Sequence, residues 1–190
     1  MARNEYRKLE DYEDIFHDAF MLMLPKFNPS NIRPSYQAEG GFTAKNQIQN
    51  NCSDGLSGFS HKDNFIYLTV LPDEDNLQSF TYPNGDVKIT RSISLKVSIY
   101  GEQSDQFALI TSSLIHTDAV LNFLNSKGLY IYDNSNGIQI INMNEEINAQ
   151  LWKRRDYTLK FNECFTIINP NMNKVAEKAD VEVIIDGSIR

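Results

Sequence analysis

The strongest constraint on the fold is a regular alternation of apolar and polar residues between positions 87 and 99. The apolar positions are Val87, Ile89, Ile93, Leu95, Val97 and Ile99, and the residues at 88, 90, 92, 94, 96 and 98 are polar. Because successive side chains of a β-strand point to opposite faces, this pattern predicts a long strand with one buried and one solvated face. At about 3.3 Å per residue the strand would span roughly 43 Å. That length exceeds a small core, so we expect the strand to project as a ribbon or to bend at the sheet edge.

A second alternation starts at residue 157 and predicts another long strand. Its apolar positions are Tyr157, Leu159, Phe161, Phe165 and Ile167, separated by polar residues at 158, 160, 162 and 166. Residues 65–71 are apolar on both faces, which is typical of a central strand covered on each side. We expect Pro72 to close this strand and the acidic, turn-prone residues 73–86 to connect it to Val87.

Two segments have the three- and four-residue spacing of amphipathic helices. In residues 9–24 the apolar face consists of Leu9, Tyr12, Ile15, Phe16, Ala19, Phe20 and Met23, and Pro25 ends the helix. In residues 104–127 it consists of Phe107, Ile110, Leu114, Leu121 and Leu124. Ser104 is the expected N-cap of this second helix, Gly128 its C′ residue, and residues 117–118 the expected position of a kink.

Shorter elements complete the predicted fold. Residues 129–132 and 138–141 flank Asn136-Gly137, which favours the positive φ angles of a turn and predicts a β-hairpin. An acidic linker is expected at 144–146, and a last short strand at 181–185.

Together these elements predict one α+β domain covering residues 1–190. Its sheet is mixed but mainly antiparallel with long strands, and an N-terminal and a central helix pack on one face. Residues 26–63 are rich in Asn, Ser, Gly and Gln and form a long loop or arm, either a flexible insertion or a segment that orders against a neighbouring subunit.

Composition limits the classes of partner. A net charge of −7 argues against a surface that grips nucleic acid, since that needs clustered Lys and Arg, but fits a protein that DNA slides past or ordinary solubility. No stretch approaches the roughly 18 apolar residues of a membrane helix, and the charged N-terminus is unlike a signal peptide. We expect a soluble protein made in a cytoplasm, with Cys52 and Cys164 as free thiols.

Motifs for catalysis or metal binding are missing from the sequence. His17, His61 and His116 are isolated from other metal-ligating residues. Residues 133–137 suggest a calcium loop, but Tyr132 stands where the first carboxylate is required. Residues 55–58 lack the spacing of a nucleophile elbow. We expect no catalytic residue, metal or cofactor, and a small enzyme or ligand-binding domain is the minor alternative.

The most distinctive cluster is Leu151-Trp-Lys-Arg-Arg-Asp-Tyr157, where the only Trp precedes three consecutive cations. Trp and Arg dominate protein interfaces, so Trp152, Arg154 and Arg155 are candidate interface residues, with the Trp as anchor and the cations as ion-pair donors. The alternative is that Trp152 caps the edge of the core while the cations face water.

The order and spacing of these parts resemble a known family. The relevant features are the N-terminal helix, the strand ending Val97-Ser-Ile-Tyr100-Gly101, the helix beginning Asp105-Gln-Phe-Ala108, the turn Gly128-Leu-Tyr-Ile, and Trp152-Lys-Arg-Arg155 opening a strand that closes in Asn169-Pro170. Over roughly residues 9–186 the chain resembles the bacteriophage neck or tail terminator family, in the broad group of the lambda-type tail terminator.

The resemblance implies a non-enzymatic virion protein located in the neck, at the head–tail junction. Such a subunit forms a ring, expected to be hexameric, that terminates the tail tube and joins it to the head connector. Its partners would be copies of itself, the tail tube and possibly the sheath protein, and the head-completion or connector protein. Genomic DNA would pass through the lumen without sequence-specific binding, and no membrane is involved. A head-completion or tail-tube subunit of the same virion is the alternative.

Overall fold

The computed structural model of the chain describes residues 7, 9–34, 62–83, 85–132, 137–147 and 150–167. The predicted strand at 181–185, Cys52, His61 and most of the predicted arm lie outside these residues. The elements are α1 (Leu9–Met23), η1 (Pro29–Asn31), β1 (Ile32–Pro34), β2 (Phe65–Thr81), β3 (Val87–Tyr100), α3 (Ser104–Leu114), α4 (Asp118–Ser126), β4 (Leu129–Ile131), β5 (Ile141–Asn142), β6 (Glu145–Ile147), β7 (Gln150–Trp152) and β8 (Arg154–Ile167). The predicted α+β class is confirmed.

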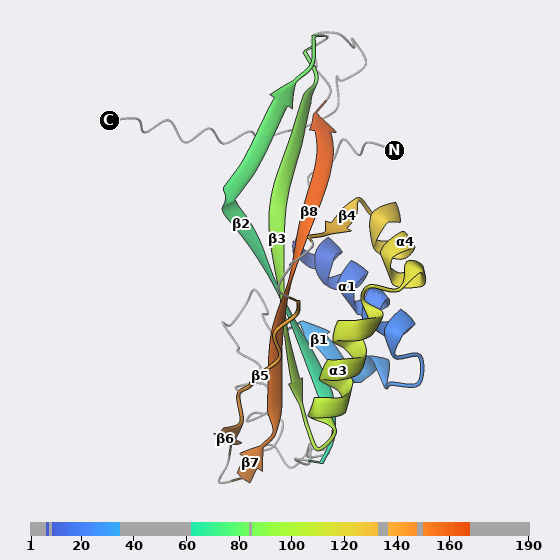
Figure 1. The fold of residues 1–190 in the computed structure, drawn as a ribbon, viewed down its shortest axis with the longest axis vertical. Coiled ribbons are helices and arrows are strands. Elements are labelled where there is room, and N and C mark those ends of the chain that lie inside the picture. The colour runs from blue at the N-terminus through green and yellow to red at the C-terminus, as the bar shows by residue number, and fades with distance from the viewer. Residues whose placement is uncertain are drawn as a thin grey trace, which may run out of the picture.

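A mainly antiparallel sheet in the order β1-β2-β3-β8-β4 forms the framework of the molecule. β3 is central, and it pairs with β2 on one side and with β8 along its whole length on the other. Figure 1 shows these three long strands side by side along the long axis, with α1, α3 and α4 gathered on one side of the sheet. The short β1 adds a parallel edge strand to β2 that the sequence pattern did not predict.

The helices cover one face of the sheet because their apolar residues meet the apolar face of the alternating strands. Ile93, Leu95, Val97 and Ile99 of β3 are all buried there. On α1, Phe16 is fully buried, and its ring centre lies 4.9 Å from that of Phe161 on β8. Burying a side chain of this size contributes about 1.5–3 kcal/mol. The predicted one-sided strands and the apolar face of α1 are therefore confirmed.

Aromatic side chains also fill the lower part of the opposite face. Phe65 and Tyr100 are register partners, and both are buried outside the helix-side core. The rings of Tyr67 and Tyr100 pack edge to face with centres 5.8 Å apart. Ile66 and Leu68 are buried on the helix side, so residues 65–68 are covered on both faces as predicted, whereas Leu71, at the end of the predicted stretch, is 50% exposed.

The upper part of the sheet continues past the helices as a ribbon (Figure 1). Residues 78–83 of β2 and the following turn are exposed, and residues 87, 89 and 90 of β3 are only partly buried. The predicted projection of the long strand is confirmed.

Two predicted boundaries were wrong. Pro72 does not close a strand, because β2 continues to Thr81 with a register irregularity between Asp73 and Gln78. Since β1 ends opposite Leu68, β2 is an edge strand among the described residues at Pro72, a position that tolerates a residue without an N–H group. The predicted acidic linker is strand β6, which forms a two-stranded hairpin with β7.

The predicted hairpin of residues 129–132 and 138–141 was also wrong. β4 and β5 do not pair with each other, since both pair with the outer edge of β8. They run in the same direction along that edge as two pieces of an interrupted strand. Gly137 has the expected positive φ of 73°, but it lies within this interruption.

The central helix is divided more sharply than a kink. α3 and α4 are bent by 68° at the break between Leu114 and Asp118. Gly128 follows α4 with a φ of 75°, as predicted for a C′ residue, whereas Ser104 is the buried first residue of α3 and Gln103 is its N-cap. No single helix in the described ranges has both the length and the apolar character needed to cross a membrane. Only the bent pair α3–α4, taken together, passes that test.

One glycine is required by a close approach of the backbone. Gly101 follows β3 with a φ of 111°, and its N–H donates to the carbonyl of Lys153 at 3.1 Å. A Cβ atom at this position would overlap with the carbonyl oxygen of Asp63 and would lie 2.6 Å from the side-chain oxygen of Asn64. This contact fixes the start of β2 against the end of β3.

Candidate interaction surface

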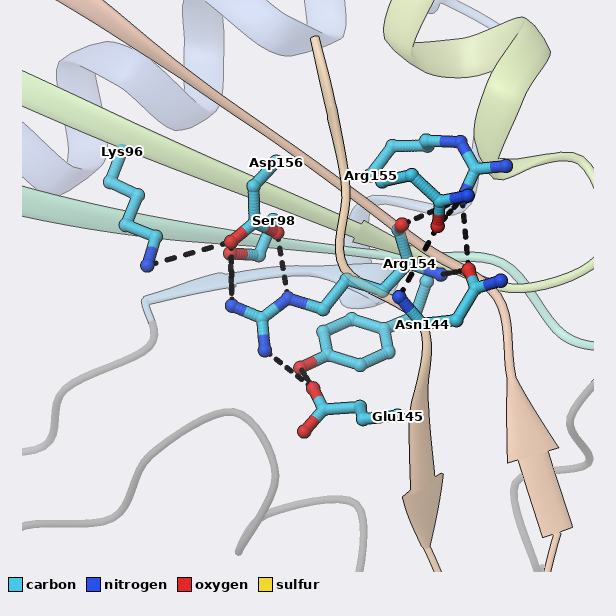
Figure 2. A network of polar contacts seen from close by, with 9 residues as sticks. Lys96, Ser98, Asn144, Glu145, Arg154, Arg155 and Asp156 are labelled. Carbon is cyan, nitrogen blue, oxygen red and sulfur yellow. Dashed lines mark hydrogen bonds and ion pairs between the residues drawn. The ribbon is translucent and has the colours of Figure 1, made fainter.

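The predicted interface residue Arg154 is bound inside its own chain (Figure 2). It lies at the start of β8, and its guanidinium donates to both carboxylate oxygens of Asp156, from Nε at 2.7 Å and from Nη2 at 2.6 Å. Nη1 pairs with Glu145 of β6. Such bidentate pairing is among the strongest side-chain interactions and fixes the guanidinium on β8, while the separate contact to Glu145 holds β6 against the sheet.

The charges around Arg154 balance. Lys96 lies 3.5 Å from Asp156, so two cations face two carboxylates, and the Tyr100 hydroxyl donates to Glu145. Burial raises the pKa of Tyr100, and its hydrogen bond to Glu145 raises it further. Burial by itself would lower the pKa of Arg154, but the hydrogen bonds to Asp156 and Glu145 and the charges around them raise it overall. Both groups therefore stay protonated across the physiological range.

Arg155 joins three elements through its side chain. Nε pairs with Asp105 in the first turn of α3, and Nη1 donates to Asn142 of β5 at 2.8 Å and to Asn144 at 2.9 Å. Only 13% of the Arg155 side chain is exposed. This residue ties the helical layer to the edge of the sheet.

Trp152 is 1% exposed in the isolated chain, and its Nε1 atom has no hydrogen-bond partner among the described residues. The three predicted residues lie close together in the fold. Neither the interface hypothesis nor the alternative of a core-edge Trp with solvated cations describes all three. Trp152 is buried, as the core-edge alternative expects, whereas Arg154 and Arg155 bind carboxylates and amides rather than water. Their role in contacts between chains stays a prediction.

A second charged cluster lies in the helix-side core and was missed from the sequence. Glu163 of β8 accepts a hydrogen bond from Nε of its register partner Arg91 at 2.8 Å and another from the hydroxyl of Tyr12 at 2.6 Å. Nη1 of Arg7 lies 3.1 Å from the same carboxylate, and Arg7 also donates to the carbonyl of Lys127 at the end of α4. All the charged side chains are nearly inaccessible, at 6–10% exposure.

A signal for this cluster exists in the two alternating patterns. The apolar series of β3 skips position 91, and that of β8 skips position 163. An Arg and a Glu at the two gaps, each on the buried face of its strand, indicate a buried pair, and the register places them opposite one another. The guanidinium groups of Arg7 and Arg91 both contact this one carboxylate. Burial, followed by the hydrogen bond to Glu163, raises the pKa of Tyr12.

The described surface carries an aromatic tip at the end of the ribbon, formed by Phe80 and Tyr82. Phe80 is 61% exposed and Tyr82 is 40% exposed. Their rings pack edge to face with centres 5.2 Å apart, so they form a preassembled pair. The turn behind them is closed by hydrogen bonds between Tyr82 and both Asp86 and Gly85.

An apolar hollow of about 310 Å³ lies where the end of α1 meets α3. We call it the α1–α3 hollow; it is lined by Met23, Leu24, Pro25, Lys26, Phe27, Phe107 and Ile110. The rings of Phe27 and Phe107 pack edge to face at 5.1 Å, so its wall is itself aromatic. A second hollow of about 170 Å³ lies beside β4 and β8 and includes His116 and Lys160.

Within the described residues, no group of three or more His, Cys, Asp or Glu side chains is placed to hold a metal ion. Cys164 is a free thiol whose sulfur lies 3.3 Å from the hydroxyl of Thr90. Comparison of the sequence with models of protein families gives no match, and neither does comparison with curated proteins.

Proposed function

We propose that this chain is a structural subunit of a tailed bacteriophage virion. In this proposal it forms a ring that terminates the tail tube and joins it to the head connector, with genomic DNA passing through the lumen. The observation that carries the proposal is the three-stranded ribbon of β2, β3 and β8, which extends past the helices and ends in exposed aromatic side chains. Exposed aromatic side chains are enriched where proteins bind other chains, and the pair at the end of the ribbon fits an assembling subunit.

The edge of the ribbon supports an assembly role. No described strand pairs with the outer edge of β2 between residues 70 and 81. An unpaired edge is a template for strand pairing with another chain. The edge offers backbone hydrogen bonds to another chain, and the aromatic tip beside it offers side-chain contacts.

The order of elements supports the phage part of the proposal. An N-terminal helix, a long strand ending in Tyr100-Gly101, a helix that follows at once, and a long strand opening after Trp152 occur in the order of the terminator family that the sequence resembles. The charge networks of Arg154 and Glu163 fit this role, since a ring subunit must hold its contact surfaces in fixed positions.

A head-completion or tail-tube subunit is the second candidate, because such proteins also assemble through strands. Copy number separates the two roles. Electron cryomicroscopy of particles that carry the labelled chain should reveal one ring at the neck of each tail if the chain is a terminator. Labels repeated along the tail would favour a tube protein, and particles without the chain would reject both roles.

A variant tests the contribution of the candidate interface residues. If the double variant R154A/R155A folds and still forms rings and particles in normal amounts, these two arginines act only within their own chain. Loss of rings by a variant that stays folded at the assembly temperature would support an interface role.

A further inference from the structure

We propose that the aromatic tip of one copy, Phe80 and Tyr82, inserts into the α1–α3 hollow of a second copy. This inference rests on the proposed function, because it names the contact through which the subunits of the ring would bind one another.

The chain cannot fill its own hollow with this tip. The tip lies at one end of the long axis, and the hollow lies in the other half of the molecule, where α1 ends beside α3 (Figure 1). The pairing of β2 with β3, interrupted only between Asp73 and Gln78, and the continuous pairing of β3 with β8 hold the tip away from the hollow. The tip must therefore reach the hollow of a different chain.

The two surfaces match in chemistry. The hollow is lined by apolar side chains, and Phe27 and Phe107 form one wall as an edge-to-face pair. Phe80 and Tyr82 form a similar pair that is exposed in the free chain. Aromatic rings gain energy from such packing beyond the area they bury. Lys26 at the rim is a cation that can lie over an incoming ring.

Charge complementarity selects α1 of a second copy as the surface beside the hollow. Asp14, Asp18 and Leu22 are exposed and follow one another at steps of four on α1, so they form a stripe that leads to the hollow. The Asp18 side chain is 68% exposed, and the Nδ1 atom of His17 lies 3.6 Å from its carboxylate. On the tip, Lys88 is exposed and is the register partner of Phe80. Insertion of Phe80 would bring Lys88 to the acidic stripe.

The area of this contact explains why it belongs to a ring. Fully buried aromatic side chains cover 150–250 Å² each, so the exposed parts of Phe80 and Tyr82 supply roughly 200 Å². A stable pair of proteins buries about 800 Å² on each partner. One tip-to-hollow contact is therefore weak, but in a closed ring each copy both donates a tip and accepts one.

Sedimentation of the full-length chain tests the aromatic part of the contact. We expect association that rises with concentration up to about 1 mM, and an association constant at least about tenfold lower for F80A/Y82A. The matched control is Y130A/Y132A, which removes two aromatic rings that are 46% and 54% exposed elsewhere and should leave association unchanged. A wild-type chain that stays monomeric over this range, or a tip variant that associates like the wild type, overturns the inference.

A charge exchange tests the partner surface. K88E and D18K should each weaken association, and the double variant K88E/D18K should recover the wild-type constant to within about threefold. K160E, which changes another exposed lysine of the same ribbon, should not be rescued by D18K. No recovery in K88E/D18K, with all variants unfolding at the wild-type temperature, contradicts the contact between Lys88 and Asp18.

Imaging separates this inference from the proposed function. Rings at the neck of particles assembled from F80A/Y82A would leave the function standing and reject the tip contact. Tip-dependent association in solution, together with absence of the chain from particles, would support the tip contact and reject the proposed function.

Discussion

Replacing Glu163 by glutamine should destabilise the fold more than any other change of a single charge that keeps side-chain size. Glutamine has nearly the same volume, so the variant creates no cavity. It removes the carboxylate that pairs with the guanidinium groups of Arg7 and Arg91. Breaking a buried ion pair by removing one partner costs about 3–5 kcal/mol, because the remaining charge stays buried.

The magnitude belongs at the upper part of this range, since two cations lose one shared partner and the Tyr12 hydroxyl loses its acceptor at 2.6 Å. For a chain of this length, 1 kcal/mol shifts the melting temperature by about 2–4 °C, so E163Q should melt at least about 6 °C lower. Urea unfolding at neutral pH, followed by circular dichroism, gives the free energy of unfolding directly. The control is E102Q, which changes an exposed glutamate and should cost less than about 0.5 kcal/mol.

A double-mutant cycle with R91M refines the test. Because Arg91 and Glu163 contact each other at 2.8 Å, the cost of the double variant should fall short of the summed single costs by at least about 1 kcal/mol. A loss below about 1 kcal/mol for E163Q, or additive costs in the cycle, would refute the argument that this cluster stabilises the core.

Urea unfolding also checks three further predictions. Burial raises the pKa of Tyr157, so the folded state keeps the phenol proton at a pH where the unfolded chain loses it. The free energy of unfolding should therefore be constant below about pH 10 and fall above it. In Y157F this fall should be smaller by up to about 1.4 kcal/mol per pH unit. G101A should cost at least about 2 kcal/mol, because its methyl group meets Asp63, whereas G137A, whose new methyl group would have nothing within 4 Å, should cost about 1 kcal/mol. R154K keeps the charge but loses the bidentate geometry with Asp156 and should cost about 2 kcal/mol; a neutral result would show that this pairing does not stabilise the start of β8.

The long strands could be predicted because their period of two reports burial directly. The pairing of the strands could not be predicted, because an alternating pattern does not say which strand lies beside it. Residues 129–132 and 138–141 fit a hairpin by their turn residues, but the edge of β8 offered a longer ladder, and both pieces pair there. The end predicted at Pro72 was wrong for a similar reason. A proline destabilises a strand only where its missing N–H group would pair with a neighbour, and the sequence does not show whether the strand lies at an edge.

The environment of the candidate site was harder to predict than the residues themselves. Trp152, Arg154 and Arg155 stand out in the sequence, but their partners do not. Asp105 lies 50 residues before Arg155, and Glu145 reaches Arg154 because β6 and β7 fold back as a hairpin. The Glu163 cluster was detectable, since charged residues occupy the gaps in two apolar series. The exposure of Phe80 could not be detected from the sequence, because it depends on where the helical layer ends.

The central place of β3 has a consequence for the route by which the chain folds. Its pairing with β2 closes through the turn at Tyr82–Asp86, so this hairpin links residues close in sequence and can form within microseconds. Pairing with β8 joins Tyr100 to Arg154 and requires α3, α4 and the following strands to be in place. Loop closure over such distances is slow, so docking of β8 should limit the folding rate. Until it docks, one edge of β3 stays open to pairing with a strand of another chain, so slow docking would favour aggregation.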